Sequence, residues 1–275
     1  MTHSRCADDS GGRVRRILLA LLLVAGAVLH PGAARPDDLK PKFGPYATPI
    51  LQSHDYLRTH RAPDYWAISP YYVPQVTRSS CSLATVATLL NALRRLPAYS
   101  SASLVTQATL LDPAAAKKPP DPEWLDKTRE WSDKVKKTGS GVTFSEFHQY
   151  VVASLNAYRL DADVKVFKPT DRSKATLNQL RRLLVANERS AKDIALIYYN
   201  QGVVTGDWDG LHLSPIGAYD TERRRVLIMD VDRQWYVPYW TSDERLLEAM
   251  LRPAPADQGS LAGQTGGVVW VKLRR

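Results

Sequence analysis

The pattern of apolar and polar residues predicts helices in the first half of the chain. After Cys81, apolar residues recur every three or four positions up to Leu93, as in a helix with one buried face. A second helix is expected from Thr143 to about Tyr158, because Thr143 and Glu146 have the spacing of a capping box. Similar patterns predict further helices at about 122–137, at 176–187 and from Ser242 to about Leu251.

Short apolar runs predict strands, most of them in the second half. They lie at 164–167, 194–199, 211–219, 225–231 and 267–273. The polar residues Asp220, Thr221 and Glu222 separate two of these runs, which therefore form a hairpin. Residues 35 to about 70 are rich in proline and are expected to be an extended surface segment. Helices followed by an antiparallel sheet make an α+β pattern.

The amino terminus has the pattern of an export signal. A cluster of arginines precedes the apolar run 17–29, and small residues suited to cleavage follow at 32–34. We expect residues 1–34 to be a signal peptide and residues 35–275 to form a single domain. The protein is then exported, in the periplasm, without stable membrane insertion after cleavage. The alternative is a membrane anchor through residues 17–29, although that run is short for a span.

Composition and charge narrow the possible partners. The chain is 44% hydrophobic and 24% charged, which is ordinary for a globular protein. Its net charge of +9 favours anionic partners. It has no recognised nucleic-acid motif, so no nucleic-acid binding is expected. Histidines and cysteines are not spaced as metal ligands, so no metal site is expected. The oligomeric state is left open.

Cys81 is the candidate nucleophile. Cys6 would leave with the signal peptide, and a lone cysteine is unusual in an exported protein, where structural cysteines come in pairs. Cys81 stands at the first turn of a predicted helix, where backbone N–H groups favour negative charge and hence a thiolate. Gln75, six residues upstream on a loop, can donate to an oxyanion. The structural alternatives are a buried small cysteine and a surface glutamine.

His212 and Asp230 are the candidate base and its partner. They are 18 residues apart on the predicted hairpin. If Thr221 is the apex, the two face each other, with Cβ atoms about 5 Å apart. The carboxylate would then orient the imidazole, which activates the nucleophile. The order of cysteine, histidine and acid, with the cysteine on a helix and the other two on strands, fits a papain-like plan. A purely structural His–Asp pair is the alternative.

At these residues the chain resembles the phytochelatin synthases. The similar segments are Gln75–Leu93, around the nucleophile, His212–Tyr219, around the histidine, and Val226–Trp240, around the aspartate and the basic-aromatic stretch after it. The resemblance covers roughly Tyr71 to Leu251. It implies a papain-like fold and an enzyme that acts on glutathione, with Cys81, His212, Asp230 and Gln75 as catalytic residues.

Two departures from the family pattern affect these expectations. Ser82 follows the nucleophile where the family usually has glycine, which adds bulk near the thiolate. The chain also ends at Arg275 without the cysteine-rich tail of plant members, so we expect the short bacterial type. Both departures favour hydrolysis over chain lengthening.

The resemblance also implies a reaction. Cys81 attacks the bond between cysteine and glycine of glutathione, and the γ-glutamylcysteinyl thioester passes to a second glutathione or to water. The first outcome builds phytochelatins in response to heavy metal. No tightly bound cofactor is expected, and Cd or Zn would enter as glutathione thiolate complexes. Arg233 is the candidate for binding a glutathione carboxylate, and Asn200 for binding the peptide.

Two alternatives to this function stay open from the sequence. One is another papain-like cysteine peptidase that acts on larger substrates. The other is a non-enzymatic exported protein that binds an anion or a metal.

Overall fold

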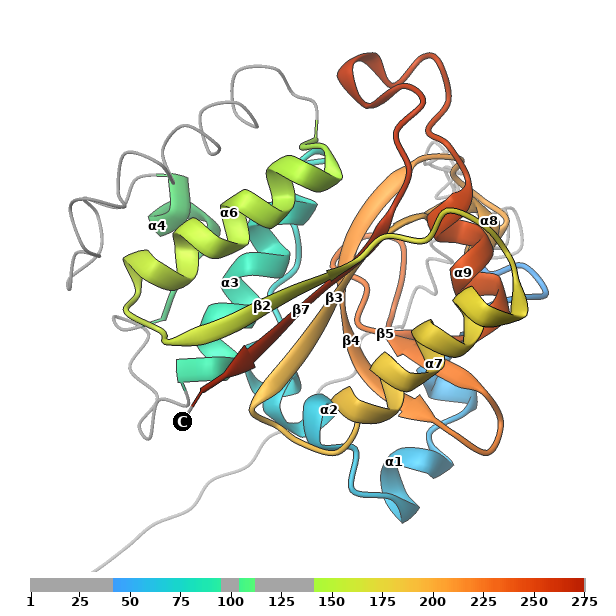
Figure 1. The fold of residues 1–275 in the computed structure, drawn as a ribbon, viewed down its shortest axis with the longest axis horizontal. Coiled ribbons are helices and arrows are strands. Elements are labelled where there is room, and N and C mark those ends of the chain that lie inside the picture. Colours follow the sequence, from blue (N-terminus) through green and yellow to red (C-terminus); the bar gives the residue numbers. More distant parts are fainter. Residues whose placement is uncertain (1–41, 95–103, 112–140, 275) are drawn as a thin grey trace, which may run out of the picture. The chain divides into compact units, whose positions relative to one another are not determined.

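The computed structural model describes residues 42–94, 104–111 and 141–274 (Figure 1). The predictions of a signal peptide at 1–34 and of a helix at 122–137 lie outside the described residues. Within the described ranges, no helix has the length and hydropathy that a membrane span requires.

The helices of the described residues differ widely in length. They are α1 (Asp55–Thr59), α2 (Pro63–Ile68), α3 (Cys81–Arg94), α4 (Gln107–Leu111), α6 (Phe144–Ala157), α7 (Lys174–Asn187), α8 (Gln201–Thr205) and α9 (Asp243–Leu251). Short 3₁₀ helices lie at Ile50–Gln52, Ser69–Tyr71 and Gly259–Leu261. The predicted capping box is confirmed, because Thr143 and Glu146 bond each other's backbone at the start of α6. Ser242 caps α9 as predicted.

The strands form one seven-stranded sheet in the order β1-β6-β5-β4-β3-β7-β2. They are β1 (Thr48–Pro49), β2 (Ala162–Phe167), β3 (Asp193–Asn200), β4 (Leu211–Asp220), β5 (Arg225–Ile228), β6 (Tyr239–Ser242) and β7 (Gly267–Leu273). Every neighbouring pair is antiparallel. The α+β prediction is therefore confirmed.

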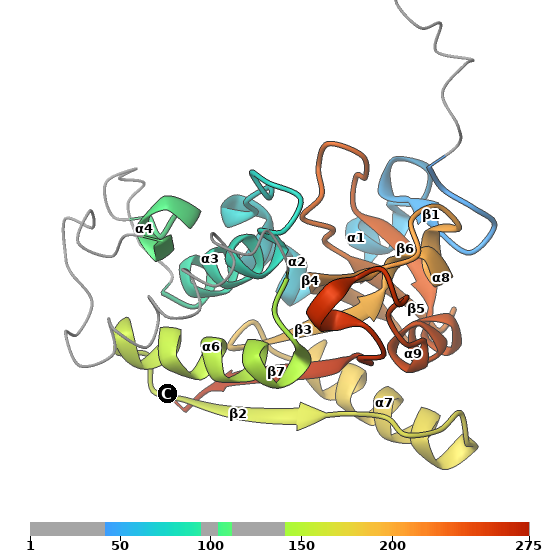
Figure 2. The same ribbon diagram turned by 90° about the horizontal axis from the view of Figure 1, so that it is seen from above.

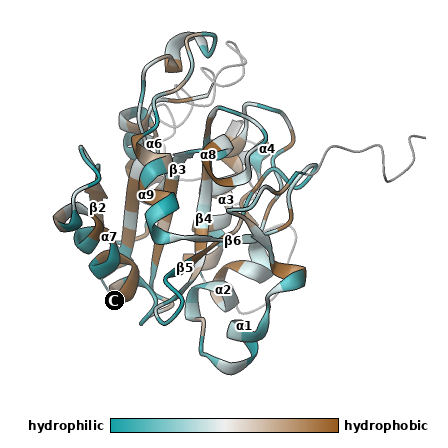
Figure 3. Ribbon diagram, turned by 90° about the vertical axis from the view of Figure 1, so that its right-hand side faces the viewer, coloured by the Kyte–Doolittle hydropathy of each residue, from teal (hydrophilic) through white to brown (hydrophobic). Residues whose placement is uncertain are grey.

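Both faces of the sheet are covered by helices, and β3 shows how. Leu196 and Tyr198 pack into the cluster that contains α3 and α6, whereas Ala195 and Ile197 pack into the cluster that contains α7 and α9. Successive side chains of a strand point to opposite faces, so a strand buried on both sides reads as one continuous apolar run. Figure 2 shows α6 and α7 on opposite sides of the sheet, and Figure 3 shows hydrophobic residues along β3 and hydrophilic ones along α1 and α7.

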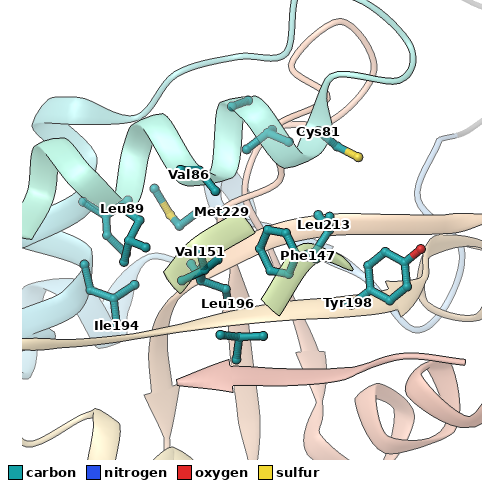
Figure 4. Close-up of a cluster of buried hydrophobic side chains, with 14 of the residues drawn as sticks. Cys81, Val86, Leu89, Phe147, Val151, Ile194, Leu196, Tyr198, Leu213 and Met229 are labelled. Atoms are coloured by element: carbon teal, nitrogen blue, oxygen red, sulfur yellow. The ribbon is translucent and has the colours of Figure 1, made fainter. Parts of the chain in front are cut away.

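Helix α3 is more deeply buried than its apolar pattern predicts. Every residue from Cys81 to Leu93 is buried, so the helix has no exposed face over that length. Its polar residues are accordingly used for bonds: Thr88 accepts from Val73 N at 3.2 Å, and Asn91 makes two bonds of 2.8 Å to the backbone of Val105. Figure 4 shows Cys81 at the end of this helix, at the edge of the apolar cluster.

The predicted hairpin is present, but its register differs from the prediction. Asp220 pairs with Arg225, so the turn consists of residues 221–224 and its apex is not at Thr221. The register also shifts at an irregularity in β4. A longer turn and a bulge change which residues face each other without changing the apolar pattern of either strand.

This register leaves His212 and Asp230 without direct cross-strand pairing, so that part of the prediction is wrong. Strand β5 ends at Ile228, before the aspartate. The chain nevertheless continues beside β4, because Met229 N donates to Pro215 O at 2.9 Å. Asp230 thus reaches the start of β4 along an irregular segment.

The segment before α3 is also more structured than predicted. Instead of an extended lead-in, its described part contains β1, α1, α2 and two 3₁₀ helices. Proline suits the first turn of a helix because it has no N–H to leave unpaired, and Pro63 occupies that place in α2.

Candidate active site

Cys81 is the first residue of α3 and lies next to the strand that carries His212. The helix is tied to that strand one turn later, where Thr85 Oγ1 donates to Leu213 O at 3.2 Å. The thiol is 7% exposed, which makes it nearly buried yet reachable. Tyr198 lies at the same end of the cluster (Figure 4), and its hydroxyl donates to Val142 O at 2.8 Å.

His212 is bonded to Asp230 through one ring nitrogen. Nε2 lies 3.0 Å from Asp230 Oδ1, and both side chains are buried. Because the carboxylate takes Nε2, Nδ1 is the ring nitrogen left for a proton transfer. The imidazole thereby has one nitrogen for orientation and one for chemistry, as a catalytic histidine requires.

The Asp230 carboxylate is saturated with hydrogen bonds. Besides His212, its donors are Asp232 N at 2.9 Å, Gln201 Nε2 at 2.7 Å, and the hydroxyls of Tyr239 and Tyr199 at 2.8 and 3.2 Å. The two tyrosine hydroxyls also lie 2.7 Å apart. A buried carboxylate without donors would become neutral. This shell instead keeps Asp230 charged and fixes its orientation.

His212 and Asp230 stabilise each other's charged form. Burial alone would disfavour the imidazolium, but the Asp230 carboxylate and the Cys81 thiol outweigh it and raise the pKa of His212 to about 10. Burial would likewise raise the pKa of Asp230, yet the imidazolium and the surrounding donors hold it below its ordinary value. At neutral pH His212 therefore carries a proton that it can give to a leaving amine.

Gln75 lies against the segment that follows Asp230. Its backbone N donates to Val231 O at 2.8 Å. Burial raises the pKa of the half-buried Asp232, and the nearby side-chain amide of Gln75 opposes the rise. Gln75 Oε1 is buried without a hydrogen-bond partner among the described residues. The loop thus brings Gln75 to the rim of the site, and its role as oxyanion donor stays a prediction.

The two candidates for substrate binding are placed differently. Arg233 is exposed, and its guanidinium lies 5.1 Å from the centre of the Tyr72 ring, three residues after Asp230. Asn200 is fully buried. Its Oδ1 accepts from Val203 N at the start of α8, and its Nδ2 donates to Asp209. Arg233 is thus available to a ligand, whereas these bonds already occupy Asn200, whose binding role stays a prediction.

Ser82 is buried directly after Cys81. Its side chain is 1% exposed, and its hydroxyl has no hydrogen-bond partner within the described ranges. A buried hydroxyl without a partner is costly. Among the same residues, no group of three or more His, Cys, Asp or Glu could hold a metal ion.

Several residues of the site escaped the sequence analysis. Tyr199 and Gln201 lie two residues apart at the junction of β3 and α8, and Tyr239 lies on β6, so no local pattern links all three to Asp230. The available signals were weak: Tyr239 belongs to the basic-aromatic stretch, and Tyr199 ends a strongly apolar strand. A buried polar group in such a strand needs a partner, which is the argument that could have singled out Tyr199.

Comparison with known proteins identifies one family. A sequence model described as phytochelatin synthase matches residues 52–260 of this chain. This range contains Gln75, Cys81, His212, Asp230 and Arg233.

Curated relatives match over most of this chain but a minor part of their own length. The Arabidopsis thaliana protein named glutathione gamma-glutamylcysteinyltransferase 1 is 29% identical over 190 residues, 68% of this chain and 33% of that protein. The Schizosaccharomyces pombe glutathione gamma-glutamylcysteinyltransferase is 27% identical over 217 residues, 78% of this chain and 44% of that protein. The chain therefore spans about a third to under half of these relatives.

Proposed function

This chain belongs to the phytochelatin synthase family, and from that premise we propose that it cleaves glycine from glutathione through a thioester on Cys81. The γ-glutamylcysteinyl group then passes to water or to a second glutathione. The observation that carries the proposal is the buried pair of His212 and Asp230, with Nε2 3.0 Å from Oδ1, on the strand next to the helix that begins at Cys81.

The first half of the reaction forms the thioester. The Cys81 thiolate attacks the carbonyl carbon between cysteine and glycine of glutathione, and a tetrahedral intermediate forms. When the carbon–nitrogen bond breaks, His212 Nδ1 gives its proton to the nitrogen of the departing glycine. Asp230 keeps the imidazole in place throughout, because Nε2 stays bonded to its carboxylate.

The second half releases the acyl group. Water or the amine of a second glutathione attacks the thioester carbon, and its proton returns to His212 Nδ1. The carbon–sulfur bond breaks and the thiolate is restored. Gln75 and the backbone N–H of Cys81 stabilise the negative oxygen in both halves, as donors aimed at a developing oxyanion do.

The negative charge of glutathione is complementary to the positive charge near the site. Glutathione carries two carboxylates, and Arg233 is an exposed cation close to the triad on a chain of net charge +9. The near-burial of Cys81 favours a small peptide over an extended protein substrate. This observation supports glutathione over the alternative of a general papain-like peptidase, although the α+β fold is compatible with both.

Hydrolysis is proposed to outrun transfer. Water is always present, so transfer wins only if a second glutathione is held in place, where positioning is equivalent to an effective concentration of about 10⁵ M or more. Ser82 adds a buried side chain beside the nucleophile, which favours the smaller acceptor. Cadmium or zinc would then act as part of the acceptor, as a glutathione thiolate complex.

Product analysis tests the proposal. Purified protein is incubated with a series of glutathione concentrations, with and without cadmium, and glycine, γ-glutamylcysteine and longer peptides are quantified by mass spectrometry. We expect glycine and γ-glutamylcysteine in equal amounts at low glutathione. Longer peptides dominating at the lowest concentration without metal would show a well-formed acceptor site, and absence of glycine release would overturn the function.

A further inference from the structure

Gln107, outside every motif discussed so far, binds the backbone on both sides of Gln75. It is the first residue of α4 and is 4% exposed. Its Nε2 donates to Pro74 O at 2.7 Å, and its Oε1 accepts from Val76 N at 3.2 Å. A single side-chain amide therefore clamps the residues immediately before and after Gln75.

Other bonds hold the same loop from different directions. Gln75 N donates to Val231 O at 2.8 Å, which ties the residue to the segment after Asp230. Ser80 Oγ accepts from Val76 N and Thr77 N at 3.1 and 3.0 Å, which folds the loop toward α3. The backbone at Gln75 is thus fixed between α4 on one side and the sheet segment on the other.

We propose that Gln107 is a positioning residue that holds the Gln75 amide where the oxyanion of the reaction forms. The inference rests on the proposed function, in which Gln75 is an oxyanion donor. A side-chain donor is effective only if it waits at the right place before the charge develops. Gln75 lies on a loop, and the clamp supplies the rigidity that the loop lacks.

The side chain of Gln75 is consistent with this role. The Gln75 amide lies near enough to Asp232 to lower the pKa of that carboxylate, so its NH₂ group is the end that faces the acid. An NH₂ group has two hydrogens, and no hydrogen bond between the described residues holds either of them. With the backbone clamped by Gln107, the amide is kept close to the place where the oxyanion forms.

The chain offers a matched control for the clamp. Gln258 binds the backbone on both sides of Gly210 in the same manner, accepting from Leu211 N at 3.2 Å and donating to Asp209 O at 3.4 Å. Gln258 precedes the 3₁₀ helix Gly259–Leu261, and the segment that it holds leads into β4 and His212 rather than into the loop of Gln75. Loss of either clamp removes the same two kinds of bond.

A double-mutant cycle separates positioning from a merely structural role. Gln75→Ala should lower kcat about 100- to 1,000-fold, as removal of one oxyanion donor does. Gln107→Ala should lower kcat about tenfold to a hundredfold with little change in KM, the order of loss expected for a displaced catalytic group. In the Gln75→Ala background the second change should cost less than about twofold, because residues that act through each other are not additive.

Gln258→Ala is the control. Its effect on kcat, whatever its size, should be the same in the wild-type and Gln75→Ala backgrounds. Gln107→Glu keeps the acceptor for Val76 N but sets a carboxylate oxygen against Pro74 O in a buried site, so its kcat should fall at least as far as that of Gln107→Ala. A full-sized effect of Gln107→Ala in the Gln75→Ala background, or no effect on kcat in wild type, would overturn the proposal.

Hydrogen–deuterium exchange keeps this inference distinguishable from the proposed function. Gln107→Ala should speed amide exchange in the peptide that covers residues 72–80, whereas Gln258→Ala should not. This result needs no substrate, so it is informative even if wild-type protein releases no glycine. Unchanged protection of residues 72–80 would refute the clamp, and faster exchange with inactive wild type would refute the function alone.

Discussion

The two sides of the candidate active site are built differently. On the sheet, Asp230 is fully buried and its carboxylate is surrounded by five donors: His212, Gln201, Tyr199, Tyr239 and the backbone N of Asp232. On the helical side, by contrast, polar atoms around the nucleophile are left over. The hydroxyl of Ser82 and Oε1 of Gln75 are buried without partners in the described part of the chain.

This difference follows from what each side must do. A buried carboxylate stays charged only if donors replace the water it has lost, so the acid side must be complete before substrate arrives. The side of Cys81 instead leaves polar atoms unpaired before substrate binds: the Ser82 hydroxyl can donate, whereas Oε1 of Gln75 can only accept. We therefore expect substitutions on the acid side to affect stability and turnover together, and those on the nucleophile side to affect turnover alone.

Removal of the reacting groups should have the largest effect. Cys81→Ser and His212→Ala should each lower kcat by about 10⁴-fold or more, because nucleophile and base act as one unit. Cys81→Ser should melt at the wild-type temperature, since the two side chains are nearly the same size. Glycine release and thermal unfolding are the measurements. A Cys81→Ser protein that kept more than a small fraction of the wild-type rate would exclude Cys81 as nucleophile.

Asp230→Asn should have the next largest effect, because it removes the negative charge that the surrounding donors bind. The amide can still orient the imidazole, so some turnover should remain, with a loss of up to about 10⁴-fold. The new NH₂ group faces donors instead of accepting from them, so the free energy of unfolding should drop by about 1–3 kcal/mol. Steady-state rates and urea unfolding decide this. Equal stability to wild type would mean that the donor shell does not depend on the charge.

Tyr239→Phe should have smaller effects, one on stability and one on kcat. The hydroxyl donates to the Asp230 carboxylate at 2.8 Å, and a bond to a charged group contributes about 1.5–3 kcal/mol. Tyr219→Phe is the matched control, because its hydroxyl donates to the buried Asp243 carboxylate at 2.8 Å, away from the triad. Both variants should lose similar stability in urea, but only Tyr239→Phe should lower kcat. A kcat loss shared by both would mean that general destabilisation causes it.

Glu188 is a second carboxylate to compare with Asp230, and its expected effect, on the pH dependence of stability, is the smallest. It is a partly buried carboxylate with two donors among the described residues, Tyr219 N at 2.7 Å and Tyr56 Oη at 3.0 Å. Burial outweighs these donors and raises the pKa of Glu188 to about 7. The folded protein then binds this proton more tightly than the unfolded chain, so this contribution to stability is complete below about pH 4.5 and is lost as pH rises through about 7.

Urea unfolding between pH 5 and pH 8 measures this contribution. The free energy of unfolding should fall less over that range in Glu188→Gln than in wild type, while turnover stays unchanged because Glu188 lies outside the triad and its donors. An identical pH dependence in both proteins would show that Glu188 keeps its ordinary pKa.

The candidate site was predictable where chemistry follows from a local pattern. Cys81 at a helix start and His212 on a strand are such cases, and so are the ends of β7. The donor shell of Asp230 was not predictable, because the sheet order brings Tyr199 and Gln201, at the end of β3, together with Tyr239 on β6. The hairpin register failed for a related reason, since the irregularity in β4 depends on packing rather than on the apolar pattern.

The amino-terminal side of the fold was harder to predict than the sheet. The short helices α1 and α2 are each five or six residues long, which is too few for a helical apolar period to stand out. Gln107 lies in a helix of five residues, and its bonds go to a loop some thirty positions away. Such a contact leaves no trace in local sequence.

The most direct test of the account is to trap the acyl-enzyme. Wild-type protein is mixed with glutathione, quenched with acid at short times, and analysed by mass spectrometry after proteolysis. We expect a γ-glutamylcysteinyl group on the peptide that contains Cys81, formed as glycine is released and absent in Cys81→Ser. Glycine release without any adduct on Cys81, or an adduct on another residue, would contradict it.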